Sequence, residues 1–522
     1  MTNLLSSLSK RVFYPNADFK KSRKRRWLII KKLSVFLTVL CILFMFSGTF
    51  YAYAADDLPL AAEAPVTAGS PALPSAFDSR QLNIVPPVRN QGDSESCWAF
   101  AAVSAMEIDA VKQGLLSADS VDFSEAHLVW FTFTPAEDEN DILCGESYIA
   151  SSSPYVTRGN WTRATGTLAR LSGAANEIDF PFYAESDEFE LMGNYPEEAR
   201  YISDDIILDE TAVLPSAQAV KEWITLHGSC TAMMYYSTKY ENEETASYYY
   251  FGSSGNINHM ITIVGWDDNY PASAFKSDPE KNGAWLVRDS RGEDSHNDGY
   301  FYLSYEDTSL STFAGYSVRP ASDFDSRYTY NAVGFSPCFQ HSNGVSVANV
   351  FCTEKRELLS ALSFYTVDAD TAADVAVYRL PDFSGNDPTA GEMIFSQSQT
   401  YHYAGYHTLD LPEAADLSPD TVFSVVITYS TPGKTVTVPV EYCNTVNNGC
   451  RYTSADGQSF CYMFDKTEQW CDSQSLGLGN FYINAYTCEP SVDSTDFLAV
   501  FNTHFLKLIE IVLKIITAVC GA

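Results

Sequence analysis

A change of sequence texture near residue 325 most constrains the fold of this 522-residue chain. Before it, apolar residues at helical spacing, as over 98–113 and 217–227, alternate with strand-like runs such as 259–264, a mixture typical of an α+β domain. After it, short alternating or β-branched segments are separated by turn residues, a pattern that favours an all-β sandwich. The chain is too long for one ordinary domain, so we expect two, over residues 73–320 and 325–490.

The first 54 residues have the features of an export signal. A basic cluster over 20–26 precedes an apolar run over 33–50, and Ala52-Tyr53-Ala54 supplies small residues of the kind that signal peptidase cuts after. We expect residues 1–54 to be a signal peptide, with an uncleaved membrane anchor as the alternative. In both cases the body of the protein is exported, so we expect it to be secreted or held at the cell surface.

Two further segments lie outside the expected domains. Residues 55–72 are rich in Ala and Pro and are expected to form a short leader or linker. Residues 497–519 are apolar except for a polar stripe at steps of three and four residues, the pattern of an amphipathic helix. Charged residues in the middle of this stripe disfavour a membrane-spanning helix. We expect either peripheral membrane contact or packing on a protein surface.

The amino-acid composition limits the classes of partner that the protein can bind and the oxidation states that its cysteines can have. The formal net charge of −33 at pH 7 argues against a nucleic-acid partner and favours solubility outside the cell. Of the 12 cysteines, one lies in the predicted signal peptide, so the exported part has an odd number and keeps one thiol free or pairs it between chains. Three pairs are close enough in sequence to be disulfide candidates: Cys338 with Cys352, Cys443 with Cys450, and Cys461 with Cys471. No paired C-x-x-C motif or interleaved histidine indicates zinc, and we expect no metal and no cofactor.

Cys97 is the natural candidate for the free thiol. It follows turn-forming residues and stands at the start of the helical pattern over 98–113. Ser94 or Ser96 could cap that helix, and Gly114 could end it. The unpaired N–H groups of the first turn and the positive end of the helix dipole would then face the sulfur and favour a thiolate. A thiolate is the nucleophilic form of cysteine.

Several motifs of residues 73–305 resemble, in order and separation, those of the papain family of cysteine peptidases. They are Asn90-Gln91-Gly92 with Cys97-Trp98-Ala99-Phe100, Phe123-Ser124-Glu125, Asn258-His259 with the strand to Trp266, Trp285 to Gly292, and Gly299-Tyr300-Phe301. The resemblance implies a two-lobed papain-like catalytic domain. It also implies an endopeptidase that hydrolyses peptide bonds of a protein or peptide substrate.

The same resemblance assigns chemical roles to four residues. It implies that Cys97 is the nucleophile, that His259 acts first as general base and then as general acid, and that Asp289 orients His259. It implies that the Gln91 side chain and the Cys97 N–H stabilise the oxyanion of the tetrahedral intermediate. By the same alignment, the substrate-binding residues are Gly159, Asn160, Trp161 and Asn258.

The sequence also departs from the family pattern. Asp289 stands where the family usually has Asn, and Arg291 stands where it has a Trp that shields the pair from water, which predicts a wetter and weaker orienting interaction. Arg158 replaces one glycine of the usual Gly-Gly. His296, which lies close to Asp289 in the sequence, is interpreted as part of a solvated loop. Arg291 and Arg158 support one alternative, a catalytically silent surface adhesin. A cysteine-based acyl transfer to an amine instead of water is a further alternative.

Residues 325–490 resemble, more loosely, the lectin-like β-sandwich that follows papain-like domains in some bacterial exported proteins. The strand-like segments are 345–351, 357–367, 373–378, 406–411, 422–428 and 435–440. The resemblance implies a cell-surface glycan as a second ligand. Exposed Tyr and Phe side chains could stack on sugars, but the core of a sandwich needs the same residues. The expected architecture is therefore an α+β, papain-like domain followed by an all-β, lectin-like sandwich.

Overall fold

A computed structural model describes residues 73–490, with gaps at 137–146, 149–152, 254–256, 332–337, 342–343, 382–384, 432, 434, 442–445, 448–449, 452–453 and 465–468. The predicted signal peptide (1–54), leader (55–72) and amphipathic helix (497–519) lie outside the described residues. Within the described ranges, no helix has both the length and the apolar character that crossing a membrane requires.

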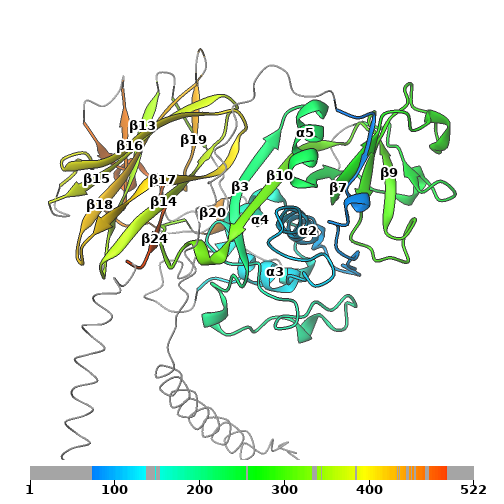
Figure 1. Ribbon diagram of the computed structural model, residues 1–522, viewed down its shortest axis with the longest axis horizontal. Helices are drawn as coiled ribbons and strands as arrows, with labels where there is room; N and C mark the ends of the chain where they lie inside the picture. Colours follow the sequence, from blue (N-terminus) through cyan, green and yellow to red (C-terminus); the bar gives the residue numbers. More distant parts are fainter. Residues whose placement is uncertain are drawn as a thin grey trace, which may run out of the picture. The chain divides into compact units, whose positions relative to one another are not determined.

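The described residues from 73 to 320 include four α-helices, namely α2 (Cys97–Lys112), α3 (Glu125–Phe133), α4 (Trp161–Leu168) and α5 (Ala217–His227), which are labelled in Figure 1. Polar side chains begin three of them: Ser124, Asn160 and Ser216 each accept a hydrogen bond from a backbone N–H in the first turn. Gly228 follows α5 with a φ of 88°, a left-handed conformation that ends a helix and favours glycine. The helices predicted over 98–113 and 217–227 are confirmed.

Helix α2 is buried on all sides. Every residue from Trp98 to Ala110 is buried, including the polar Ser104, Glu107 and Asp109, so other elements enclose the helix around its whole circumference. It packs against α3 and α4 and against strands of the neighbouring sheet (Figure 1). The core around α2 therefore holds the start of the helix, where Cys97 lies, in a fixed position.

One nine-stranded sheet runs through the first domain in the order β3-β10-β4-β7-β8-β9-β6-β5, with β1 paired to β7. Its strands are β1 (Ala76–Asp78), β3 (Ile206–Leu214), β4 (Cys230–Met234), β5 (Glu241–Asn242), β6 (Ser247–Tyr248), β7 (His259–Asp267), β8 (Ala284–Arg288), β9 (Tyr300–Ser304) and β10 (Ser311–Pro320). All pairs are antiparallel except β6 with β9. In the antiparallel pair of β7 and β8, Thr262 lies opposite Arg288, so the residue that follows β8 lies near the start of β7.

The second domain is a sandwich of two antiparallel sheets. The four-stranded sheet has the order β11-β24-β14-β17, and the six-stranded sheet has the order β16-β15-β18-β13-β22-β23. The strands are β11 (Ser326–Tyr328), β13 (Val345–Cys352), β14 (Glu357–Thr366), β15 (Thr371–Leu380), β16 (Glu392–Tyr401), β17 (Gly405–Leu417), β18 (Val422–Ser430), β22 (Ser459–Met463), β23 (Cys471–Asp472) and β24 (Ile483–Cys488). Alternate residues such as Ala373, Val375 and Val377 enter the shared core, as a period of two requires. The expected α+β domain followed by an all-β domain is confirmed.

Short elements complete the described chain. The remaining strands are β2 (Ser147–Tyr148), β12 (Cys338–His341), β19 (Val436–Pro439), β20 (Val446–Asn447) and β21 (Cys450–Arg451). The 3-10 helices are η1 (Ser79–Leu82), η2 (Pro154–Val156), η3 (Phe189–Leu191), η4 (Glu197–Ala199), η5 (Thr238–Tyr240), η6 (Ala272–Ala274), η7 (Ala321–Asp323) and η8 (Gln474–Leu476).

The two domains are in direct contact through β3 and β17. The Val213 N–H donates to the Ala404 carbonyl at 2.7 Å, and the Tyr406 N–H donates to the Thr211 hydroxyl at 3.0 Å. Tyr406 is buried in the same hydrophobic core as α2, together with Tyr365. The contact therefore combines backbone hydrogen bonds with buried aromatic rings.

Candidate active site

Cys97 is the first residue of α2 and is partly exposed. Ser96 is the N-cap residue, but its side chain makes no capping hydrogen bond, and the Ser94 hydroxyl accepts only from the Ser96 N–H, at 3.3 Å. The predicted side-chain cap is therefore wrong. The Ala99 N–H donates to the Ser96 carbonyl at 2.8 Å. Because no side chain caps this end, the N–H groups of Cys97 and Trp98 and the positive end of the dipole remain available beside the sulfur.

Gln91 lies in the loop before α2, and both ends of its side-chain amide are fixed. The amide oxygen accepts from the Ser290 hydroxyl at 2.6 Å, and the amide nitrogen donates to the Ser94 carbonyl at 2.7 Å. The Gln91 backbone N–H donates to the Ser290 carbonyl at 2.7 Å. The loop that carries Gln91 is thus joined directly to the segment that follows Asp289.

His259 and Asp289 form a buried pair. His259 begins β7, Asp289 follows β8, and the His259 Nε2 lies 2.7 Å from the Asp289 Oδ1. His259 is 4% exposed and Asp289 is 1% exposed. The Ser290 N–H also donates to the Asp289 Oδ1, at 2.8 Å. The prediction of a wetter pair is wrong, because both residues are buried.

The electrostatics of the pair favour two charged groups. Burial lowers the pKa of His259, but the charge and hydrogen bond of Asp289, together with the influence of the nearby Cys97 side chain, outweigh it and raise that pKa to about 9. Burial raises the pKa of Asp289, but His259 and His296 outweigh it and hold that pKa well below its usual range. Since the Nε2 of His259 contacts Asp289, Nδ1 is the ring nitrogen that can interact with Cys97.

His296 is a second histidine on the same carboxylate. Its Nε2 lies 2.9 Å from the Asp289 Oδ2, and its Nδ1 lies 2.6 Å from the Glu241 Oε1. The Tyr236 hydroxyl donates to the other oxygen of Glu241 at 2.6 Å. The side chain of His296 is only 4% exposed, so its interpretation as part of a solvated loop is wrong. The turn between β8 and β9, with Gly292 and His296 at positive φ, brings the ring back to Asp289.

Arg291 and Tyr236 cover the outer side of the pair. Arg291 Nε lies 3.5 Å from the Asp289 Oδ2, and its guanidinium lies 4.6 Å from the centre of the Tyr236 ring. The Tyr236 ring lies 5.9 Å from the ring of His259, centre to centre. Tyr236 therefore provides an aromatic cover for His259. Sequence reasoning missed Tyr236 and Glu241, because the segment that carries them has no motif that points to the site.

The predicted substrate-binding residues have different surroundings. Gly159 lies against the indole of Trp98, which a Cβ would overlap. The Asn160 side chain caps α4 by accepting from the Arg163 N–H at 3.0 Å, and Trp161 is buried in the core around α2. Asn258, next to His259, bonds with its side chain to the N–H and carbonyl of residue 236. The side chains of Asn160, Trp161 and Asn258 are therefore all engaged in contacts within the protein.

The cysteines of the described chain differ from the disulfide prediction. Free thiols are found at Cys97, Cys230, Cys352, Cys461, Cys471 and Cys488. Cys461 and Cys471 are opposite each other in the register of β22 and β23, yet both are free. Cys443 is outside the described residues. Among the residues that the structure describes, no cluster of three His, Cys, Asp or Glu side chains could hold a metal ion.

Comparison with protein families identifies both domains. Residues 73–318 match the model of the papain family of cysteine proteases, and residues 328–487 match the model of the lectin like domain. The chain therefore contains a papain-family cysteine protease domain followed by a lectin-like domain.

Relatives and a solved structure are similar to one or both parts of the chain. This chain is 22% identical to the senescence-specific cysteine protease SAG12 of Arabidopsis thaliana over 253 residues, which are 48% of this chain and 62% of the relative. The chain is 24% identical to procathepsin L of Rattus norvegicus over 251 residues, which are 47% of this chain and 66% of the relative. The chain thus spans less than two thirds of the length of these relatives.

The structure of the cysteine protease and lectin-like domains of Cwp84, a surface layer associated protein of Clostridium difficile, is similar over both domains. The TM-score is 0.67 at 23% identity, and the match covers 80% of this chain and 89% of that one. This similarity shows a shared fold for the pair of domains.

Proposed function

We propose that this protein is an exported cysteine endopeptidase that hydrolyses peptide bonds through Cys97, His259 and Asp289. The observation that carries the proposal is the position of His259, whose Nε2 lies 2.7 Å from the Asp289 carboxylate and whose pKa the nearby Cys97 side chain also raises. A charged histidine beside a thiol holds the sulfur as a thiolate. The Asp289 carboxylate fixes the orientation of the ring and stabilises its charged form.

The reaction follows from this arrangement. The Cys97 thiolate attacks the carbonyl carbon of the scissile peptide bond, and the carbonyl oxygen becomes an oxyanion. His259 gives its proton from Nδ1 to the leaving amine, and a thioester with Cys97 remains. Water then attacks the thioester while His259 takes one of its protons, and the acid product leaves as the thiolate and histidinium are restored.

Two N–H groups are suited to stabilise the oxyanion. One is the backbone N–H of Cys97 at the start of α2, and the other is the second N–H of the Gln91 amide, whose first N–H donates to the Ser94 carbonyl. The Ser290 hydroxyl holds the amide oxygen of Gln91, so the nitrogen is oriented before substrate arrives. Preorganised donors of this kind are worth about 10²–10³ in rate each.

Substrate contacts are expected on both sides of Cys97. We propose that the backbone of Gly159 pairs with an extended peptide, with Asn258 near the leaving-group side. Arg158, next to Gly159, forms an ion pair at 3.0 Å with Glu95, two residues before the nucleophile. Because Arg158 is 65% and Glu95 39% exposed, a polar side chain of the substrate can reach this ion pair.

The lectin-like domain offers a site for a cell-surface glycan. A groove of about 270 Å³ lies on the face of the six-stranded sheet directed away from the sandwich core, and Trp470 lines it. Asp374, Thr428 and Ser346 lie opposite one another on β15, β18 and β13, so three polar side chains follow one another across the sheet. Hydroxyl and carboxylate groups beside an aromatic ring suit a neutral sugar.

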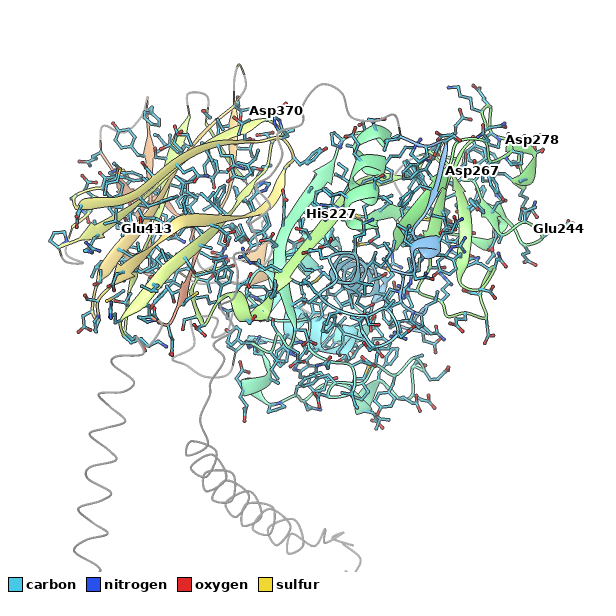
Figure 2. All side chains as sticks on the ribbon, in the orientation of Figure 1. His227, Glu244, Asp267, Asp278, Asp370 and Glu413 are labelled. Carbon is cyan, nitrogen blue, oxygen red and sulfur yellow. The ribbon has the colours of Figure 1, made fainter. Side chains whose placement is uncertain are left out.

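The glycan proposal is tested by retention of the full-length chain on insoluble cell-wall glycans. Asp374→Ala should reduce retention severalfold, because it removes a polar group that lines the groove. Glu413→Ala, an exposed acid on β17 (Figure 2), removes the same charge outside the groove and should not. Equal retention of the two variants contradicts a site in this groove.

The predicted signal peptide and the similarity to a surface layer associated protein support export to the cell surface or the medium. The predicted helix over 497–519 would add peripheral membrane contact. An adhesin without catalysis is the alternative function, and the buried His259–Asp289 pair argues against it, since an adhesin has no use for a charged pair beside a thiol.

Labelling of Cys97 tests the peptidase proposal. The full-length chain is treated with a thiol-directed epoxide and assayed for casein cleavage, beside Cys97→Ser and Cys352→Ser. Cys352 is a suitable control because it is a free and exposed thiol in the second domain. We expect labelling and cleavage to be lost only in Cys97→Ser. The proposal is contradicted if the parent protein is neither labelled by the epoxide at Cys97 nor able to cleave casein.

A further inference from the structure

We propose that His296, as a charged imidazolium, is a positioning residue that fixes the Asp289 carboxylate for His259. This inference rests on the proposed peptidase function and extends it beyond the three predicted catalytic residues. It begins from an unusual environment for a histidine, since both ring nitrogens face carboxylate oxygens: Asp289 Oδ2 at 2.9 Å and Glu241 Oε1 at 2.6 Å.

The hydrogen bonds define the charge of His296. An ionised carboxylate accepts hydrogen bonds and cannot donate one, so each ring nitrogen must carry a proton to bond with its partner. A neutral imidazole has one N–H and would turn a lone pair toward a carboxylate. Because the side chain of His296 is only 4% exposed, water cannot replace the missing hydrogen bond to the carboxylate. The ring therefore has to be an imidazolium when both contacts are made.

The charged and titratable groups around His296 are consistent with a cation at this position. Asp289 and Glu241 contact it directly, Arg291 and His259 contact Asp289, and Tyr236 donates to Glu241. The ring of Phe301 packs at 4.8 Å between centres and brings no charge. Two buried carboxylates this close to one bridging ring need a cation between them. Although burial lowers the pKa of His296, the two carboxylates outweigh it and raise that pKa to about 9.

The contact with His296 prevents the carboxylate of Asp289 from rotating. The Oδ1 atom serves His259 and the Ser290 N–H, while the Oδ2 atom serves His296 and Arg291. A carboxylate held at one oxygen can turn about its Cβ–Cγ bond, but one held at both oxygens keeps its plane. The Asn that the papain family usually has here carries N–H donors of its own, whereas an Asp needs donors from outside. His296 is such a donor, and Arg291 adds an ion pair at 3.5 Å.

The positive charge of His296 also sets how firmly His259 holds its proton. An uncompensated carboxylate at 2.7 Å would stabilise the histidinium so strongly that His259 would give up its proton to the leaving amine less readily. The cation on the far side of Asp289 offsets part of that stabilisation. His296 therefore contributes both to the geometry and to the proton affinity of His259.

His296→Gln is the primary test in the full-length protein, with cleavage of a fluorogenic peptide as the assay. Glutamine keeps one hydrogen-bond donor but has no charge. We expect kcat to fall about 10- to 100-fold, because small displacements of a catalytic group have costs of this size, while KM changes less than about threefold. The pH profile of kcat/KM should move upward by about half a unit to one unit, because a positive charge near His259 is gone. A merely structural role would not move the pH profile.

Asp289→Asn provides a matched background. The amide side chain of this variant has no negative charge for His296 to offset, and it has N–H donors of its own. Adding His296→Gln to the Asp289→Asn variant should therefore lower kcat/KM by less than about threefold. His227→Gln is the control: His227 ends α5 (Figure 2), is largely buried and bonds to Asp109 at 2.9 Å, yet it belongs to a different cluster. It should leave the pH profile unchanged.

Glu241→Gln supplies a second, independent measurement if the His296 variant does not fold. The Gln amide can still accept from His296 and bond to Tyr236, but the negative charge that helps to hold the proton on His296 is gone. We expect the fall of kcat/KM on the alkaline side to begin at lower pH by about one unit.

The outcomes separate this inference from the proposed function. If the parent neither labels at Cys97 nor cleaves peptide, the peptidase proposal fails whatever His296 does. The positioning role is overturned if the parent is active and both His296→Gln and Glu241→Gln keep its pH profile. It is also overturned if His296→Gln costs as much in the Asp289→Asn background as it does in the parent.

Discussion

The Ser290 hydroxyl donates to the side-chain oxygen of Gln91 at 2.6 Å, while the Ser290 backbone N–H donates to the Asp289 carboxylate at 2.8 Å. One residue thus holds both the predicted oxyanion donor and the group that orients His259. A disturbance at Ser290 should therefore reach two parts of the proposed mechanism.

Ser290→Ala tests this link. Loss of the hydroxyl frees the Gln91 amide to rotate, so we expect kcat/KM to fall about 10-fold, and Gln91→Ala to cost about 10²–10³. The double variant should cost little more than Gln91→Ala alone, because Ser290 would act through Gln91. Ser346→Ala, which removes a hydroxyl bonded to Thr428 in the second domain, should leave peptide cleavage unchanged. Additive losses in the double variant would contradict the link.

Gly159→Ala is expected to reduce both stability and activity. The added Cβ would overlap the indole of Trp98, a fully buried residue that directly follows the nucleophile. Overpacking of this kind costs about 1–3 kcal/mol, and the shift of Trp98 should lower kcat at least severalfold. Thermal unfolding and peptide cleavage measure the two effects. Gly385→Ala, where a Cβ would have open space apart from an ordinary contact, serves as the control, and an equal effect of the two changes would count against this account.

Glu107 predicts a pH dependence of stability. Burial is the largest influence and, against nearby Arg288, raises the pKa of Glu107 from 4.5 to about 7. Between these two pH values the folded protein holds a proton that the unfolded chain releases, so the free energy of unfolding falls as pH rises through this window. Glu107→Gln, which can still accept from the Phe123 N–H, should flatten the fall by about 1–3 kcal/mol. Urea unfolding at about pH 5 and about pH 8, on either side of this window, measures the difference, and parallel curves for parent and variant would refute it.

Arg158→Ala separates stability from substrate selection. The ion pair with Glu95 is exposed, with Arg158 65% and Glu95 39% accessible, so its loss should change the free energy of unfolding by less than about 1 kcal/mol. Kinetics should change more, because the free Glu95 carboxylate would then favour peptides with a basic side chain. A set of peptides that differ only in one charged residue beside the scissile bond measures this, and an unaltered ranking would exclude Arg158 from substrate selection.

Much of the fold could be predicted from the sequence because its signals are local. The helix over 98–113 and the strands over 345–351 and 422–428 have strong periodic patterns, and they agree with α2, β13 and β18 to within about two residues. The strand β16 was not predicted. It is the edge of its sheet and has few apolar side chains, so its pattern is that of a polar loop.

The site was predictable only where a motif marks it. Cys97, His259 and Asp289 each lie in a recognisable segment, and the structure brings His259 next to the other two. The role of His296 could not be derived, because it depends on the path of one turn and on Glu241, which is 55 residues away in sequence. Polar residues around a turn predict exposure, and only the tertiary structure reveals that this one folds inward.

The contact between β3 and β17 has a consequence for how this protein can be divided. β3 is the outermost strand of the nine-stranded sheet, and Ala404 and Tyr406 occupy hydrogen-bonding groups that would otherwise be open along it. Cutting the chain between the domains would expose this strand edge together with the buried rings of Tyr365 and Tyr406, a combination that promotes self-association. We therefore expect the β-sandwich to protect the protease domain from aggregation, and we expect an isolated protease domain to self-associate before it loses activity.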